Sequence, residues 1–186
     1  YICGNPPYLG SKWQTDEQKA DLGAIFDKRI KNWKSLDYVA GWFMKAADYG
    51  TTTQATAAFV STNSICQGQQ VPILWPSIFQ TNNQIVFAHT SFKWANLASH
   101  NAGVTVVIVG ISSSTDISKR LYSVSGEDAE HIVERKDLLN INAYLVPAPN
   151  VEVQQSPKPM QGLPPMQFGN HPYYGTALIF STDDAR

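Results

Sequence analysis

Apolar residues recur at helical spacing in two segments near the start of the chain. The tetrapeptide "TDEQ" at residues 15–18 fits a capping box, in which Thr15 caps a helix and Gln18 reaches back to it. Four apolar residues follow this cap on one helix face: Leu22, Ile25, Phe26 and Ile30. A second set follows Ser35 and also shares one face: Val39, Trp42, Phe43, Ala46 and Ala47. The pattern predicts two amphipathic helices, with Gly50 placed to end the second.

Short apolar runs between polar segments predict β-strands. The runs are at residues 1–4, 55–62, 84–91 and 103–112, and the first reads as the end of a buried strand. The last, "GVTVVIVGIS", is apolar on both faces, which predicts burial on both. Residues 69–80 predict a Pro-interrupted helix. Strands that alternate with helices indicate an α/β layer fold. No helix separates residues 84–91 from 103–112, so we expect an antiparallel pair at one edge of the sheet.

The character of the chain changes after residue 113. Charged residues concentrate in "SGEDAEHIVERKD" at residues 125–137, which is typical of a solvated helix or hairpin. A proline-rich tract at residues 147–165 indicates an extended connector, and an aromatic, glycine-rich segment closes the chain. We therefore expect three regions, at residues 1–113, 114–165 and 166–186.

Length and composition indicate a globular domain without an overall charge that attracts nucleic acid. The chain has 186 residues, of which 43% are hydrophobic, enough for one domain with a core. Its formal net charge of −1 argues against a complete DNA-binding protein but leaves open a piece of one. The apolar runs are too short to span a bilayer. Because the chain opens on Tyr1 inside a strand-like run, we expect it to be a piece of a longer polypeptide.

The cysteines and histidines lack the spacing of a disulfide framework or a metal site. Cys3 and Cys66 are isolated, which indicates free thiols and a reducing compartment, the cytoplasm. We expect Cys3 to be a buried, inert thiol. The histidines are scattered and predict no metal site; they are His89, His100, His131 and His171.

The motif "NPPY" at residues 5–8 follows the first predicted strand directly. Its prolines fix φ and lack an N–H group, so the bend is stiff. The side-chain oxygen of Asn5 and the carbonyl oxygen of Pro6 suit the two N–H groups of an amino group conjugated to a ring, such as that of adenine. Both oxygens would stabilise the positive charge that develops on the nitrogen when it is alkylated, while Tyr8 stacks on the ring. An ordinary strand-to-loop turn is the alternative for the same residues.

The motif resembles the catalytic motif of amino-methyltransferases that use S-adenosylmethionine. Three later segments are similar to the MmeI-like group of type IIL restriction-modification enzymes, which carry an adenine-specific DNA methyltransferase: "FKWANLASHNAGVTVVIVG", "INAYLVPAPN" and "MQFGNHPYYGTALIFS". The resemblance implies the C-terminal half of a class I (Rossmann-like) methyltransferase sheet with helices, ending in an antiparallel β pair and followed by a partly irregular extension. It assigns residues 1–113 to the catalytic half, 114–165 to an extension and connector, and 166–186 to the start of a target-recognition region. Double-stranded DNA is the implied partner.

The resemblance also implies roles for individual residues. Asn5, Pro6 and Tyr8 are expected to be catalytic, and Pro7 to stiffen the bend beside the substrate. A second aromatic residue is expected against the opposite face of a flipped base, and Trp94 is our choice. Three neighbours are expected near the DNA as well: Phe92, Lys93 and Asn96. Ordinary core packing stays open for Trp94, and solvation alone stays open for Lys93.

S-adenosylmethionine is the implied cofactor, and Asn5 is the residue of this chain expected to lie beside it. The group needs a glycine-rich turn after an earlier strand, so that the backbone can approach the cofactor, whereas no G-x-G sequence occurs here. We therefore expect most of the cofactor site to lie upstream of Tyr1. The isolated chain is expected to be inactive and to bind the cofactor weakly or not at all.

Two other functions stay open. "NPPY" also occurs in enzymes that methylate the glutamine side-chain amide of translation release factors, and a non-catalytic DNA-docking module is the third reading. The continuation of the chain through residues 114–186 favours DNA, because a target-recognition domain must be attached.

Overall fold

The computed structural model describes residues 1–94, 104–125, 131–154 and 156. The predictions for Asn96, His100, His171 and residues 166–186 lie outside the described residues. Tyr1–Gln154 form one compact unit. Its strands and helices run in this order: β1 Ile2–Gly4, α1 Asp16–Phe26, η1 Trp33–Ser35, α2 Ala40–Thr53, β2 Ala57–Thr62, η2 Asn63–Cys66, α3 Gln70–Gln80, β3 Gln84–Trp94, β4 Val104–Ser112, β5 Lys119–Ser125 and β6 His131–Leu138.

The first predicted helix, α1, has the cap that its sequence indicates. Gln18 N donates to Thr15 Oγ1 at 3.3 Å, and Thr15 N donates to Gln18 Oε1 at 3.0 Å. The capping box is therefore confirmed. Leu22 and Phe26 are fully buried, as their spacing predicts. The Pro-interrupted helix is confirmed as α3, which contains Pro76.

The second predicted helix, α2, differs from the prediction at its end and on its face. It continues past Gly50 to Thr53, and Gln54 follows in the left-handed conformation. Gly50 instead permits a close approach, because a Cβ there would lie 3.2 Å from Asn83 Oδ1. Trp42, expected on the buried face, is 45% exposed because it lines an open groove between α1 and α2.

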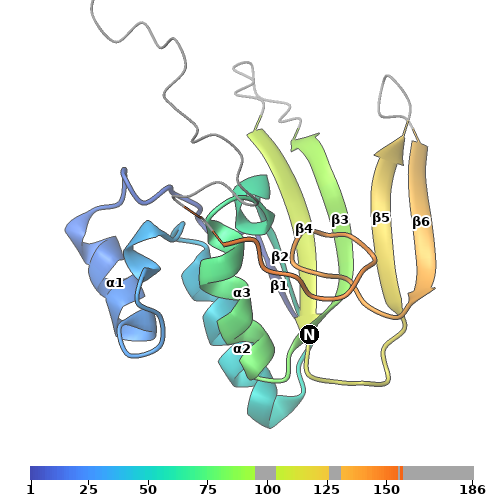
Figure 1. Cartoon of the computed structure of the whole chain (residues 1–186), viewed down its shortest axis with the longest axis horizontal. Coiled ribbons are helices and arrows are strands. Elements are labelled where there is room, and N and C mark those ends of the chain that lie inside the picture. The colour runs from blue at the N-terminus through green and yellow to red at the C-terminus, as the bar shows by residue number, and fades with distance from the viewer. Residues whose placement is uncertain (95–103, 126–130, 155, 157–186) are drawn as a thin grey trace, which may run out of the picture. The chain divides into compact units, whose positions relative to one another are not determined.

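The six strands form one mixed sheet in the order β1-β2-β4-β3-β5-β6. The predicted antiparallel pairing of β3 with β4 is confirmed, but this pair lies in the middle of the sheet and not at its edge. The reason is that β4 inserts between β2 and β3, antiparallel to both, while β5 adds parallel to β3. β1, β2, β3 and β5 therefore run in the same direction, and their carboxyl ends meet at one edge of the sheet (Figure 1).

The charged segment at residues 125–137 contributes to a hairpin. β5 and β6 pair antiparallel, and the Tyr122 hydroxyl donates to Glu134 Oε1 at 2.9 Å across the pair. β6 is mostly exposed, as its charge indicates. The sheet thus continues past residue 113, where we expect the catalytic half to end and the extension to begin. That boundary falls between strands of one sheet, and the division of roles across it stays a prediction.

The prediction that the first strand is buried is wrong. Cys3 and Gly4 are exposed, because within the described residues β1 pairs on one side only, with β2. The predicted buried thiol at Cys3 is wrong for the same reason. Cys66, by contrast, is buried, and its burial raises the pKa of its thiol.

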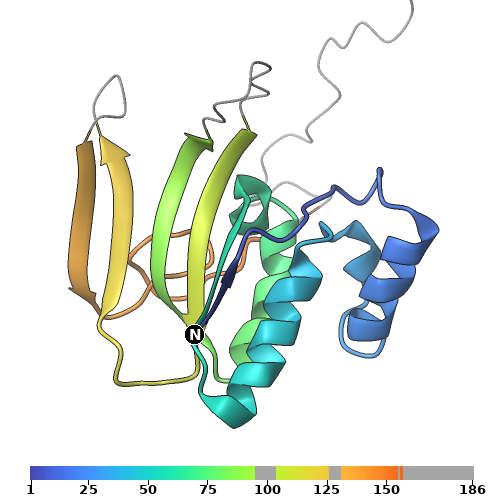
Figure 2. The ribbon, with the colours of Figure 1, turned by 180° about the vertical axis from the view of Figure 1, so that it is seen from behind.

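The three α-helices lie together beside the β1-β2-β4 part of the sheet, as the two opposite views show (Figures 1 and 2). α2 contacts β2 and β4, and α3 packs against α2. Phe43 on α2 joins these layers, since its ring centroid lies 5.2 Å from that of Phe59 on β2 and 5.9 Å from that of Trp75 on α3. β4 is buried over most of its length, as its apolar pattern predicts. Three residues that follow β6 complete the core: Ile141, Ala143 and Leu145.

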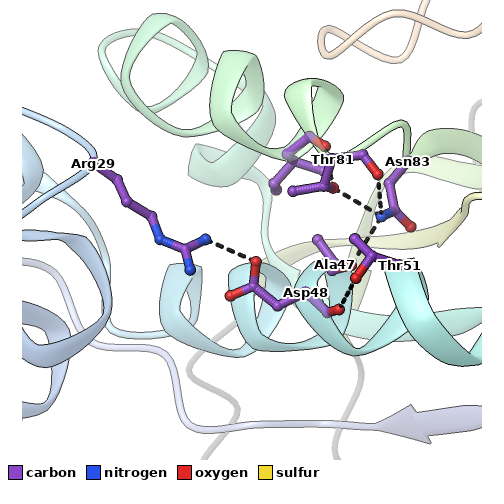
Figure 3. A network of polar contacts seen from close by, with 7 residues as sticks. Arg29, Ala47, Asp48, Thr51, Thr81 and Asn83 are labelled. Atoms are coloured by element: carbon purple, nitrogen blue, oxygen red, sulfur yellow. Dashed lines mark hydrogen bonds and ion pairs between the residues drawn. The ribbon is translucent and has the colours of Figure 1, made fainter.

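Polar contacts connect α2 to segments on either side of it (Figure 3). Arg29, which follows α1, forms an ion pair with Asp48 at 2.7 Å. Asn83, which precedes β3, donates from Nδ2 to the Ala47 carbonyl oxygen at 3.0 Å and to Thr81 Oγ1 at 2.8 Å. Because Asn83 is buried, these bonds fix the start of β3 against the C-terminal half of α2.

Gly110 on β4 allows the Phe87 ring to lie across the middle of the sheet. Gly110 pairs with Phe87 on β3 and with Ala58 on β2. A Cβ at Gly110 would overlap the Phe87 ring, so either the ring or the strand would have to move. The absence of a side chain is therefore a packing requirement at this position.

We expect Gly110→Ala to lower the free energy of unfolding by about 1–3 kcal/mol, the usual cost of overpacking a core. Denaturant unfolding measures this change. Gly4→Ala is the matched control on another strand, because nothing lies within 4 Å of a Cβ at that position. If Gly110→Ala is as stable as Gly4→Ala, the close packing of Phe87 on Gly110 is wrong.

Candidate active site

The NPPY motif lies directly after β1, at the carboxyl edge of the sheet. β1 and β2 pair in parallel, and their register ends with Gly4 opposite Phe59. Asn5 is the next residue along the chain. Ligands of open α/β sheets bind outside the carboxyl ends of the strands, so the motif occupies the usual position for a binding site.

The four residues of the motif differ in exposure. Pro6 is buried and fixes the bend to the body of the molecule, whereas Asn5 and Pro7 are exposed. Tyr8 is half-buried, with one part of its side chain packed against the core. Within the described residues, the Asn5 carboxamide makes no hydrogen bond. Its oxygen is therefore available to a ligand.

The main chain immediately after Tyr8 is held at both of its polar groups. Leu9 N donates to Asp37 Oδ1 at 2.8 Å. The Leu9 carbonyl oxygen accepts from Tyr38 N at 3.0 Å and from Gln14 Nε2 at 2.9 Å. We call these three bonds the Leu9 clamp. It connects the end of the motif to the segment that precedes α2.

Asp37 is a buried carboxylate that joins three segments. It is 5% exposed, and its Oδ1 also accepts from Val39 N at 3.2 Å at the start of α2. Its own N–H donates to Gln70 Oε1 at 3.1 Å on α3. Burial raises the pKa of the Asp37 carboxyl above its usual value, and the N–H groups of Val39 and Leu9 offset part of that rise. No cation pairs with Asp37 in the part of the chain that the structure describes.

The sequence analysis missed Asp37 and Gln14, although a local signal for Asp37 was present. "SLDYVAGWF" places a single acidic residue within an apolar run just before a helix, and Asp is a preferred N-terminal cap. Its second partner, Leu9, lies 28 residues earlier in the chain, and no local pattern indicates that contact.

The segment predicted to supply a second aromatic residue lies at the end of β3. Trp94 is the last residue of β3, Lys93 is exposed, and Phe92 is half-buried. The Phe92 ring centroid lies 4.6 Å from that of His89. β3 runs parallel to β1, so its carboxyl end lies at the same edge of the sheet as the motif, with β2 and β4 between them. The topology thus brings both segments to one edge, and the stacking roles of Phe92 and Trp94 stay predictions.

The described residues contain no group of three or more His, Cys, Asp or Glu side chains that would hold a metal ion. In the same part of the chain, no helix has both the length and the apolar character needed to cross a membrane.

Comparison with known proteins gives concordant matches. A family model, the DNA-methyltransferase domain of MmeI, matches residues 1–123. DNA methyltransferase A of Bacillus subtilis (strain 168) is 48% identical over 183 residues, which are 97% of this chain and 20% of that protein. A solved structure of the type IIL restriction-modification enzyme MmeI in complex with DNA is 41% identical, with a TM-score of 0.83; the match covers 92% of this chain and 23% of that one.

The mixed sheet, its helices and the NPPY motif at its carboxyl edge define half of a Rossmann-like methyltransferase, and the likeness to MmeI confirms this fold class. The chain belongs to the MmeI DNA-methyltransferase domain family, as the sequence resemblance indicates.

Proposed function

We propose that the polypeptide carrying this chain transfers a methyl group from S-adenosylmethionine to the exocyclic amino group of an adenine flipped out of double-stranded DNA. We place this activity in a cytoplasmic restriction-modification system. The family membership and the similarity to MmeI, solved in complex with DNA, support the proposal. The observation that carries it is Asn5, an exposed carboxamide without a partner among the described residues, on a proline bend at the carboxyl edge of the sheet.

The two acceptor oxygens at the bend prepare the amino group for reaction. Asn5 Oδ1 and the Pro6 carbonyl oxygen accept the two N–H groups of the base and hold its nitrogen lone pair out of conjugation with the ring. As the nitrogen forms its new bond to carbon, positive charge develops on it, and the same two oxygens stabilise that charge. The surplus proton then leaves to water. Neither oxygen acts as a nucleophile, so rate comes from positioning.

In this proposal Tyr8 holds the flipped base by stacking, and a second aromatic residue stacks on the opposite face of the base. Flipping the base out of the duplex costs a few kcal/mol. One stacking contact with an aromatic side chain contributes about 1–3 kcal/mol, so stacking on Tyr8 offsets much of that cost. Trp94 is the proposed second aromatic residue, with Phe92, Asn96 and Lys93 beside it. Lys93 is exposed, which suits a contact to a phosphate.

Asn5 fits the part of the cofactor that reacts, the methyl group on sulfur. The residues of this chain do not fit the rest of the cofactor. S-adenosylmethionine supplies an electrophilic methyl group on a sulfonium when bound. The unpaired oxygen of the Asn5 carboxamide would suit a site where positive charge moves from the cofactor sulfur to the amino nitrogen of the base. The sequence contains no G-x-G, the glycine pattern that would let the backbone approach the rest of the cofactor. Because the chain spans 20% of DNA methyltransferase A, we propose that the remaining cofactor site lies in another part of the polypeptide, and that residues 166–186 begin a target-recognition region.

We expect tritium from labelled S-adenosylmethionine to appear in adenine-containing duplex DNA when the longer polypeptide is assayed. Digestion of the DNA to deoxynucleosides should place the label on N6-methyl-2′-deoxyadenosine. A translation release factor in a parallel reaction should stay unlabelled. Label in the release factor and none in DNA would replace the proposal by the glutamine-amide reading, and label in neither would favour a non-catalytic docking module.

We expect Asn5→Ala in the same polypeptide to reduce methyl transfer by orders of magnitude while DNA affinity changes little. The substitution removes one of the two acceptors that stabilise the developing charge, and such groups contribute about 10²–10³-fold in rate. Single-turnover transfer and a DNA binding titration measure the two effects. Asn32→Ala, at another exposed asparagine whose side chain forms no cap, is the matched control. Normal turnover by Asn5→Ala would show that Asn5 is a turn residue only.

We expect calorimetric titration of residues 1–186 with S-adenosylmethionine to show weak binding or none, and this chain alone to transfer no methyl group. The reason is that the sequence contains no G-x-G for the turn that the cofactor needs. A longer polypeptide that includes the remaining cofactor site is the positive control. Tight binding by the 186-residue chain would overturn the proposed division of the cofactor site.

A further inference from the structure

The stretch from Asn5 to Tyr8 has few hydrogen bonds of its own. The register of β1 with β2 ends at Gly4, and the two prolines have no N–H group to donate. Within the described residues, the next main-chain bonds are those of Leu9. Within the described residues, hydrogen bonds therefore hold the main chain at the two ends of the motif, the end of β1 and the Leu9 clamp, while buried Pro6 and half-buried Tyr8 pack between them.

We propose that Asp37, assisted by Gln14, is a positioning residue for methyl transfer, because it fixes the main chain at Leu9 and thereby the height and tilt of Tyr8 and of the proline bend. The inference rests on the proposed function and extends it to residues that do not touch the substrate. Asp37 acts through Leu9 N at 2.8 Å and Gln14 acts through the Leu9 carbonyl oxygen at 2.9 Å.

The burial of both side chains shows that the clamp is part of the packed structure. Asp37 is 5% exposed and Gln14 is 6% exposed. Gln14 Nε2 also donates to the Leu36 carbonyl oxygen at 2.9 Å, so a single amide group joins the two segments. The bond to Leu36 is buried, and the two side-chain bonds to Leu9 are partly buried, so the side chains that form the clamp are held by the surrounding packing.

A helix cap does not account for Asp37. The N-terminal cap residue of α2 is Val39, and no side chain caps this helix. Here a buried carboxylate divides one oxygen between Val39 N of the α2 start and Leu9 N of the motif. The same oxygen therefore sets the distance between α2 and the motif.

Gln70 connects the segment that carries Asp37 to α3. Gln70 accepts from Asp37 N at 3.1 Å and donates from Nε2 to the Ser35 carbonyl oxygen at 2.9 Å. The segment that carries Asp37 is thus held from α3 on one side, while it holds Leu9 on the other. A displacement of Asp37 would move the motif relative to the sheet edge.

The test compares Asp37→Ala with Asp37→Asn in the longer polypeptide. Asp37→Ala removes the acceptor for Leu9 N, whereas Asp37→Asn retains an oxygen at that position. We expect Asp37→Ala to lower kcat about tenfold or more with KM for DNA little changed, since a misplacement of about 1 Å can cost that much. Asp37→Asn should restore kcat to within about threefold, and amide hydrogen exchange at Leu9 should be fast only in Asp37→Ala.

Thr15→Ala is the matched control for loss of a helix cap. Thr15 caps α1 through Gln18 N and has no bond to Leu9. The variant should lower stability while kcat per folded molecule stays at the wild-type value.

Because Asp37→Ala could fail to fold, Gln14→Met provides a second test of the positioning role. It preserves the length of the side chain, removes the bond to the Leu9 carbonyl oxygen, and should also lower kcat with KM little changed.

The outcomes separate this inference from the proposed function. If the wild-type polypeptide methylates DNA and both Asp37→Ala and Gln14→Met retain normal kcat, the positioning role is wrong. If Thr15→Ala loses kcat as Asp37→Ala does, general loss of stability explains the effect and the positioning role is again wrong. If the wild-type polypeptide methylates no DNA, the proposed function fails, and the positioning role fails with it.

Discussion

The proposed site depends on one hydrogen bond, from the main chain of Leu9 to the buried carboxylate of Asp37. The motif that precedes Leu9 contains two prolines, which stiffen its local shape but donate no hydrogen bond to position it. Stiffness and position are separate requirements. The prolines meet the first. The burial of Pro6 contributes to the second, and the contact with Asp37 adds a directional bond that relates the bend to a closely packed part of the molecule.

That closely packed part is the helix layer. α2 packs on the sheet through the contact of Phe43 with Phe59 and on α3 through the contact of Phe43 with Trp75. The bond from Asn83 Nδ2 to the Ala47 carbonyl oxygen joins α2 to the start of β3. Because Asp37 lies at the start of α2, the position of the helix on β2 and β4 determines where the motif lies above the carboxyl edge. A core that has no contact with substrate therefore controls the geometry of the reacting groups.

The sequence predicts those features that depend on neighbouring residues. The capping box at Thr15, the strands β1 to β4 and the antiparallel pairing of β3 with β4 follow from local patterns, and the structure confirms them. β5 was not predicted, and for the segment of β6 a helix and a hairpin both stayed open. The position of that pair in the sheet does not follow, because strand order depends on contacts between distant segments. Gly50 was predicted to end a helix since glycine often does, whereas its contact with Asn83 keeps it inside the helix. The NPPY motif can be recognised from its sequence alone. The contact between Leu9 and Asp37 cannot, because 28 residues separate the two partners.

The side chain of Asn5 in the motif has no hydrogen-bond partner among the described residues, whereas the residues of the Leu9 clamp have several. Asn5 is exposed at the sheet edge, while Leu9, Gln14 and Asp37 are joined to one another. An acceptor that must stabilise charge on a substrate cannot already be occupied, and it must not move when that charge appears. The second condition requires that the groups behind the acceptor be held in place, and the bonds of Leu9 to Asp37, Tyr38 and Gln14 hold the main chain that follows the motif. The free carboxamide of Asn5 and the bonded main chain at Leu9 are therefore complementary, since the second limits the movement of the first.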